Sequence, residues 1–352
     1  MLSMDILILS IFAIVVVLSF LEDYMPAWQK IILLFSICIA LICISTFKPM
    51  TTADAANYER YFYFNDSILI ETLTEPSYRY LSRLFLSLGF GIIAIFFTYA
   101  LIAIPIKLTF FWKLTPFVFT AMIVYVGIYY PMQDVVQIRS GVAAAFLLWS
   151  MIPLQEGRYL QATALFIIAT LFHYSSLVFL PLLFVGNMEI DKYWKWILGI
   201  TIPICILLYL AGFGAVNLIP GGAIEGKLEH YKEISETGVG VGEAYIPYKQ
   251  IMFLGEIVLL YVFIFFYETI HRHCRYAPIL IKVLVLEMSF LILLADIEVL
   301  GKRLHDLFGI FDAIAFTCLL YIIRPRYVVR IVLSAFCLVH YLVHMFHDIY
   351  FP

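Results

Sequence analysis

Five short polar segments interrupt a chain that is otherwise strongly apolar, and they hold the side chains best suited to chemistry. They comprise residues 52–61, 75–78, 137–141, 172–176 and 302–305. Among them are carboxylates and a histidine that can transfer protons, and guanidinium groups that can grip phosphate oxygens in a fork. Because ionisable groups among apolar helices are functional by default, we expect these segments to form one site.

Asp54 is the first candidate for a general base. Asn57, Tyr58 and Tyr61 follow it at spacings of three, four and seven residues, so a helix would place all four side chains on one face. A carboxylate partly withdrawn from water beside aromatic rings is suited to accept a hydroxyl proton. The alternative, a solvated loop acid or a helix cap, stays open.

Arg139 and Arg303 are the predicted ligands of a lipid-linked phosphate or pyrophosphate. A guanidinium at the edge of a membrane presents a rigid fork of donors that matches phosphate oxygens. Two structural alternatives stay open. Arg139 could pair with Asp134 or extend toward the headgroups, and Lys302, beside Arg303, could pair with Glu298 one helical turn earlier.

The histidines fall into two groups. His173, the second catalytic candidate, could donate to a phosphate, exchange a proton, or satisfy a backbone carbonyl at a turn. His340, His344 and His347 share one face of the last helix, but no other feature resembles a zinc site; we therefore expect no metal and no cofactor. Three acids inside apolar helices receive no role: Glu256, Glu287 and Asp296.

The composition places these residues in an all-α, polytopic membrane protein. Of 352 residues, 64% are hydrophobic and 13% charged, with a mean hydropathy of +0.98, whereas about 25% of a soluble domain is charged. The net charge of −3 and the lack of a basic run argue against nucleic acid. We expect one membrane domain, 1–352, with about 11–12 transmembrane segments. These lie near 5–21, 30–47, 90–111, 116–132, 139–154, 160–172, 175–187, 194–212, 249–268, 279–300, 304–323 and 328–346.

The distribution of Lys and Arg predicts the topology, because short loops rich in these residues stay in the cytoplasm. A single helix over 161–185 would place Arg158 and Lys192 on opposite sides. Two short crossings that meet at His173 remove this conflict, although one helix of 25 residues stays open as an alternative. The loops used are those of Lys107 and Lys113, Arg158, Lys192 and Lys195, Arg272 and Arg275, and Arg324, Arg326 and Arg330.

With that hairpin, all five polar segments face the extracytoplasmic side. The stretch 48–89 combines an outer loop with an interfacial amphipathic helix, entered through Thr74 as N-cap and Pro76 in the first turn. The later outer loop, 213–248, is long and contains aromatic residues, so it could cover a bound carbohydrate or lipid headgroup.

The order and spacing of these motifs resemble the EpsG/Wzy-type family of bacterial polysaccharide polymerases over about residues 50 to 310. The motifs are Asp54 with Asn57, Tyr58 and Tyr61; Glu75-Pro76 with Tyr78; Gln137-Ile-Arg139 with Gly141; Phe172-His173; and Lys302-Arg303. The resemblance implies a glycosyltransferase of the bacterial inner membrane that joins oligosaccharide repeat units carried on undecaprenyl pyrophosphate. The implied site is extracytoplasmic.

The resemblance also implies roles and partners. Arg139 and Arg303 would hold the departing pyrophosphate, with Asp54 or His173 taking the hydroxyl proton. The sugars would contact Asn57, Tyr58, Tyr61, Glu75, Tyr78 and Gln137. Lipid-linked oligosaccharide and membrane lipid are the expected partners, with a chain-length regulator and a flippase as further candidates. The rival functions are a membrane acyltransferase that modifies surface polysaccharide and a lipid-linked glycan flippase or transporter.

Overall fold

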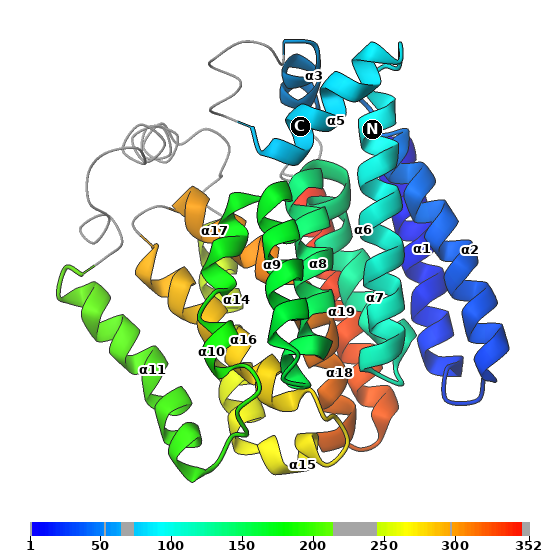
Figure 1. Ribbon diagram of the computed structural model, residues 1–352. Coiled ribbons are helices and arrows are strands. Elements are labelled where there is room, and N and C mark those ends of the chain that lie inside the picture. Colours follow the sequence, from blue (N-terminus) through cyan, green and yellow to red (C-terminus); the bar gives the residue numbers. More distant parts are fainter. Residues whose placement is uncertain (1, 53, 65–73, 214–244, 296–297, 347–352) are drawn as a thin grey trace.

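The computed structural model describes residues 2–52, 54–64, 74–213, 245–295 and 298–346, and this part of the chain is helical without strands (Figure 1). The predicted all-α, multi-pass membrane class is confirmed. Among the described residues, six helices are long and apolar enough to cross a membrane. They are α1 (Leu2–Leu21), α2 (Ala27–Thr46), α6 (Ile93–Leu114), α8 (Ile138–Gln155), α11 (Lys192–Leu210) and α19 (Arg326–Phe346).

Shorter apolar helices complete the bundle. The helices α17 (Glu298–Phe308) and α18 (Asp312–Ile322) pass the same test as one span, bent by 56°. The other elements are α7 (Val118–Val124) with a π-helical turn at Tyr125–Tyr129, a second π-helical turn at Pro131–Val136, α9 (Tyr159–Phe172), the 3-10 helix η3 (Tyr174–Phe179), α10 (Leu182–Val185), α14 (Tyr245–Phe265), α15 (Tyr267–His271) and α16 (Ala277–Leu293).

The bundle centres on α7 and the π-helical turns after it. Every residue from 117 to 136 is buried, as expected of a helical segment in which most residues are apolar. Helices α1, α6, α18 and α19 pack around α7. This central segment leads into α8, whose first turn carries Arg139, so the buried core fixes the start of α8.

The predicted hairpin at His173 is confirmed. The backbone at His173 is extended (φ −155°, ψ 117°), and the rings of Phe166 and Phe179 lie with centroids 6.3 Å apart. In one straight helix these residues would be separated by about 20 Å along the axis. The returning arm ends where Lys282 of α16 donates to the carbonyl oxygen of Val185 at 2.5 Å.

Two short helices lie across one end of the bundle, above α6 and α8 (Figure 1). They are α3 (Ala55–Tyr63) and α5 (Pro76–Ser87). The predicted amphipathic helix is present as α5, with Pro76 in its first turn. Its N-cap, however, is Glu75 and not Thr74. The Glu75 carboxylate makes no capping bond because other partners occupy it.

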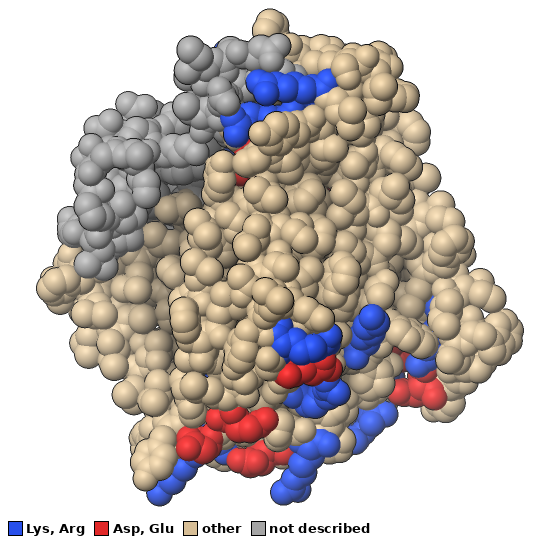
Figure 2. All heavy atoms as spheres, in the orientation of Figure 1, with Lys and Arg blue, Asp and Glu red and all other residues tan. Residues whose placement is uncertain are grey.

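The opposite end of the bundle carries many charged side chains (Figure 2). Pairs there include Lys195 with Glu268 at 2.7 Å and Arg275 with Glu156 at 2.6 Å. Lys107 differs from the prediction, because it lies inside α6, fully buried, and not in a loop. The excess of positive charge in the loops at that end therefore comes from the other Lys and Arg residues, without Lys107.

Candidate functional site

Glu75, Arg139 and His173 meet at the end of the bundle that α3 and α5 cover. One carboxylate oxygen of Glu75 accepts from the Arg139 guanidinium, and the other lies 3.0 Å from Nδ1 of His173. Glu75 precedes α5, Arg139 is in the first turn of α8, and His173 follows the last residue of α9. The three side chains are mostly buried, with 7%, 17% and 16% of their surface exposed.

Electrostatics keep the Glu75 carboxylate charged. Burial alone would raise the pKa of Glu75, but the positive charge of Arg139 and the hydrogen bond from His173 outweigh it and lower that pKa to about 2. Arg139 is a cation at the positive end of a helix, where the helix dipole disfavours it. The ion pair with Glu75 offsets this cost. The predicted alternative, a pair between Arg139 and Asp134, is wrong, because Asp134 pairs with Lys107.

Tyrosine rings form one wall of the cluster. The Tyr58 and Tyr78 ring centroids are 5.7 Å apart, and the Tyr78 hydroxyl donates to the Tyr58 carbonyl oxygen at 2.6 Å. The guanidinium carbon of Arg139 lies 5.4 Å and 6.0 Å from these two centroids, within cation–π range. Burial raises the pKa of Tyr58 to about 12, so its hydroxyl stays protonated at neutral pH.

Of the four residues predicted to share one face of a helix, the structure buries three at least in part and leaves one exposed. Asp54 is half-buried at the N-cap of α3, without a side-chain capping bond. Tyr58 is buried and Tyr61 half-buried, whereas Asn57 is exposed. Asp54 therefore borders the Tyr58 wall from α3, and Asn57 faces outward.

Lys48 is a neighbour of this site that the sequence interpretation missed. Its ammonium donates to the Val135 carbonyl oxygen and lies 4.1 Å from the Phe96 ring centroid. Burial lowers the pKa of Lys48 to about 7, against the opposing negative charge of Asp54. A cation directly after an apolar helix, six residues before Asp54, was the signal available in the sequence.

Gln137 and α17 border the cluster on its other side. The Gln137 amide nitrogen lies 3.3 Å from Oδ2 of Asp306, which ties the start of α8 to α17. Arg303 is half-buried one turn before Asp306 on α17. The two predicted pyrophosphate ligands thus lie on helices that contact each other through Gln137.

Below the start of α8 is a buried polar layer. The Lys107 ammonium lies 2.8 Å from Oε1 of Gln133 and 2.6 Å from Oδ2 of Asp134. The Tyr125 hydroxyl donates to the same Asp134 oxygen at 2.7 Å. The signal available in the sequence was a lysine within an apolar run. The layer lies directly below the start of α8 and helps to hold it in place.

His305, from the last of the five polar segments, does not join His173. It lines a cavity of about 370 Å³ between α14, α16, α18 and α19. Its Nδ1 lies 2.7 Å from Oε1 of Glu287, and its Nε2 is 3.6 Å from Glu256. Asp312, which accepts from Tyr129, lines the same cavity. Glu256 and Glu287, two of the acids to which the sequence assigned no role, thus have His305 as a common partner.

The described part of the chain holds no group of three or more His, Cys, Asp or Glu residues that could bind a metal ion. The rings of His340 and His344 stack 4.0 Å apart. His347 and Asp296 lie outside the described residues, as does most of the predicted loop at 213–248.

Comparison with protein families gives one match. The model of the EpsG family matches residues 31–352. Comparisons with curated proteins and with solved structures return no match.

Proposed function

Because this chain belongs to the EpsG family, whose membership points to a polysaccharide-polymerase-like role, we propose that it is a membrane glycosyltransferase. Its substrates are oligosaccharide repeat units linked to undecaprenyl pyrophosphate. The observation that carries the proposal is the joining of Glu75, Arg139 and His173 beside tyrosine rings at one end of the bundle.

The reaction transfers a glycan from one lipid pyrophosphate to a new repeat unit. A hydroxyl of the acceptor unit attacks the first sugar carbon of the donor glycan and forms a carbon–oxygen bond. The bond from that carbon to the pyrophosphate breaks, and its electron pair leaves with the pyrophosphate. The hydroxyl proton passes to a base on the protein, so atoms and charge balance without a nucleotide sugar.

His173 is the base that the geometry favours. Glu75 binds Nδ1, which fixes the imidazole tautomer so that Nε2 can accept a proton, and the carboxylate stabilises the imidazolium that forms. Glu75 thereby acts as a positioning residue, whereas the resemblance implied sugar contact. Asp54, half-buried at the start of α3, is the alternative base.

Arg139 is the principal ligand of the departing pyrophosphate in this proposal. Glu75 uses part of its fork, and a guanidinium has five N–H donors. Its place in the first turn of α8 adds the helix dipole, which favours an anion there. Arg303 on α17 is the second phosphate ligand, and developing charge on the leaving group is where such donors contribute most.

The glycan contacts the tyrosines. Tyr58, Tyr61 and Tyr78 supply ring faces and hydroxyls for sugar, with Asn57 exposed on the outer side of α3 and Gln137 at the start of α8. The end of the bundle that carries this site faces away from the cytoplasm, since the opposite end carries the Lys- and Arg-rich loops. A flippase supplies the substrate on that side, and a chain-length regulator is a further partner.

The test compares surface polysaccharide from cells whose own copy is deleted and replaced by variants. Arg139→Gln, His173→Asn and Glu75→Gln should each reduce polymer by about 100-fold or more, as expected when proton transfer fails or the leaving group is unsupported. Electrophoresis should show the ladder collapsing to one repeat unit. Arg158→Gln, at the other end of the bundle, is the control and should leave the ladder unchanged.

The same gels separate the alternatives. A ladder of normal length that lacks acyl groups would indicate an acyltransferase, and absence of even single repeat units at the surface would indicate a flippase. Full polymer at normal protein level from both His173→Asn and Arg139→Gln would refute the proposed site. If Asp54→Asn is more damaging than His173→Asn, then Asp54 is the base.

A further inference from the structure

An arginine-lined pocket lies at the end of the bundle opposite the candidate site. It has a volume of about 660 Å³ and is open to the outside. Its walls come from the end of α1 and the start of α19, segments about 300 residues apart in sequence. The polar residues lining it are Asp23, Tyr24, Arg324, Arg326, Tyr327 and Arg330.

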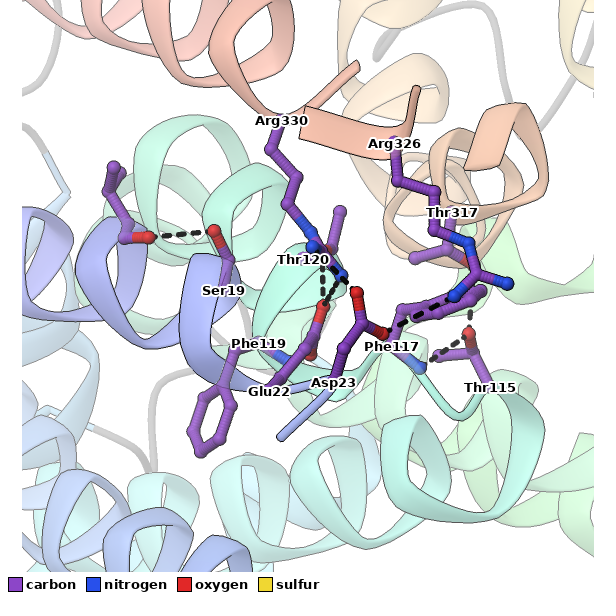
Figure 3. Close-up of polar contacts among 11 residues, drawn as sticks. Ser19, Glu22, Asp23, Thr115, Phe117, Phe119, Thr120, Thr317, Arg326 and Arg330 are labelled. Atoms are coloured by element: carbon purple, nitrogen blue, oxygen red, sulfur yellow. Dashed lines mark hydrogen bonds and ion pairs between the residues drawn. The ribbon is translucent and has the colours of Figure 1, made fainter. Parts of the chain in front are cut away.

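Two acids at the end of α1 hold two of the arginines in place. Figure 3 shows Arg326 and Arg330 pointing from α19 toward Glu22 and Asp23. Arg330 lies 3.1 Å from Oε1 of Glu22 and 2.9 Å from Oδ2 of Asp23, and Arg326 lies 3.5 Å from Oδ1 of Asp23. Phe117 packs against Arg326, whose guanidinium carbon is 4.9 Å from the ring centroid.

Glu22 is itself fixed from below. The backbone N–H of Phe119 donates to Oε2 of Glu22 at 2.9 Å, and the Thr120 hydroxyl donates to Oε1. Glu22 and Arg330 have 0% and 4% of their side-chain surface exposed. The Arg330 guanidinium therefore has a set position before any ligand binds, which reduces the entropy that binding costs.

The charges of the pocket do not cancel. Three arginines and one aspartate line it, and even with Glu22 counted the positive charges exceed the negative ones. Arg324 is exposed and has no hydrogen bond or ion pair among the residues that the structure describes. Its five donors are available to an external anion.

The pocket also lies where the apolar spans of two helices end. The apolar windows of α1 and α19 are Met4–Leu21 and Arg326–Met345, so both end at this pocket. Tyr24 and Tyr327 expose 88% and 55% of their surface, and exposed tyrosines are typical of the membrane interface. Basic pockets between transmembrane helices on the cytoplasmic side bind anionic headgroups.

We propose that this pocket binds the phosphate group of an anionic phospholipid, with Arg324 and Arg326 contacting the phosphate oxygens. Arg330 is held by Glu22 and Asp23 and positions the floor of the pocket. The site is independent of the proposed glycosyl transfer, because its residues belong to the other end of the bundle.

Binding is measured as the rise in thermal midpoint of protein purified in an uncharged detergent, since a ligand of the native state stabilises it by mass action. The probes are phosphatidylglycerol, phosphatidylcholine and inorganic phosphate at constant ionic strength. Arg324→Gln is the test variant, because it leaves the Glu22–Arg330 network intact. Arg272→Gln is the matched control, since it removes one exposed arginine elsewhere at the same end.

Phosphatidylglycerol should stabilise the wild type and Arg272→Gln, while Arg324→Gln should need about tenfold more lipid for the same shift, as expected for loss of one charge-assisted contact. Phosphatidylcholine should have little effect. If inorganic phosphate alone gives the Arg324-dependent shift, the same phosphate site is supported with a soluble ligand. Arg324→Lys should recover most of the lipid response, which distinguishes lost charge from a folding defect.

The proposal is overturned if phosphatidylglycerol shifts the wild type, Arg324→Gln and Arg272→Gln equally, because surface charge alone would then explain binding. It is equally overturned if neither phosphatidylglycerol nor inorganic phosphate shifts the wild type.

Discussion

At the scale of single residues, the candidate site depends on one carboxylate with two partners. Glu75, Arg139 and His173 were all identified in the sequence, but not the contacts among them. Glu75 is 64 residues from Arg139 and 98 from His173, and no local pattern specifies which acid meets which base across such separations. Local reasoning offered the nearby Asp134 as an alternative partner of Arg139, whereas Asp134 pairs with Lys107 of the neighbouring helix.

The depressed pKa of Glu75 predicts a defined acid sensitivity. Its pKa is about 2 in the folded protein and 4.5 when unperturbed, so the unfolded state binds more protons between these values. The stabilisation is complete above pH 4.5 and is lost as pH falls toward 2. Thermal midpoints measured over this window should fall less steeply for Glu75→Gln than for the wild type. Glu59→Gln, an exposed substitution on α3, should keep the wild-type slope.

Lys48 predicts a response of the same sign in the alkaline range. Burial lowers its pKa from 10.5 to about 7, so the unfolded state again binds more protons, here between pH 7 and 10.5. Stability from this residue therefore increases as pH rises through that window. Lys48→Met should flatten the increase in thermal midpoint, whatever the absolute stability of the variant. An unchanged slope in Lys48→Met, matching that of the exposed control Lys192→Met, would contradict the assignment.

At the scale of elements, the apolar runs predicted most of the helices, and the side of the membrane assigned to the Lys- and Arg-rich loops predicted the hairpin at His173. The bend between α17 and α18 was not predictable in this way. A Cβ atom at Gly309 would lie 1.8 Å from the Tyr129 ring, so the chain turns where a distant tyrosine requires a glycine. Lys107 was placed in a loop because its partners, Gln133 and Asp134, come from a segment 26 residues or more away.

Gly141 sets the position of α8 and hence of Arg139. A Cβ atom there would lie 2.2 Å from the Gln133 carbonyl oxygen, and backbone cannot move aside as a side chain can. Gly141→Ala should therefore displace the first turn of α8, abolish most polymer formation and lower the thermal midpoint. Gly199→Ala in α11 is the control, because nothing lies within 4 Å of its Cβ position. It should be neutral or stabilising by up to about 1 kcal/mol.

At the scale of the whole molecule, the two ends of the bundle differ in kind. One end carries the Glu75 cluster under α3 and α5. The other end carries many charged side chains (Figure 2) and the arginine-lined pocket. The hairpin of α9 with η3 and α10 makes this division possible, because it returns the chain to the basic end before α11. Without it, the loops of Arg158 and Lys192 would face opposite sides.

This polarity predicts which residues are reached from outside the cell. In a chain whose own cysteines are replaced by alanine, Asn57→Cys on α3 and Arg272→Cys after α15 introduce single exposed thiols at opposite ends. A membrane-impermeant maleimide should label Asn57→Cys in intact cells and Arg272→Cys only after permeabilisation. The reverse pattern would place the Glu75 cluster in the cytoplasm, where it could not act on glycans already translocated. Equal labelling of both in intact cells would contradict a fixed orientation, and labelling of both after permeabilisation confirms that each thiol is reactive.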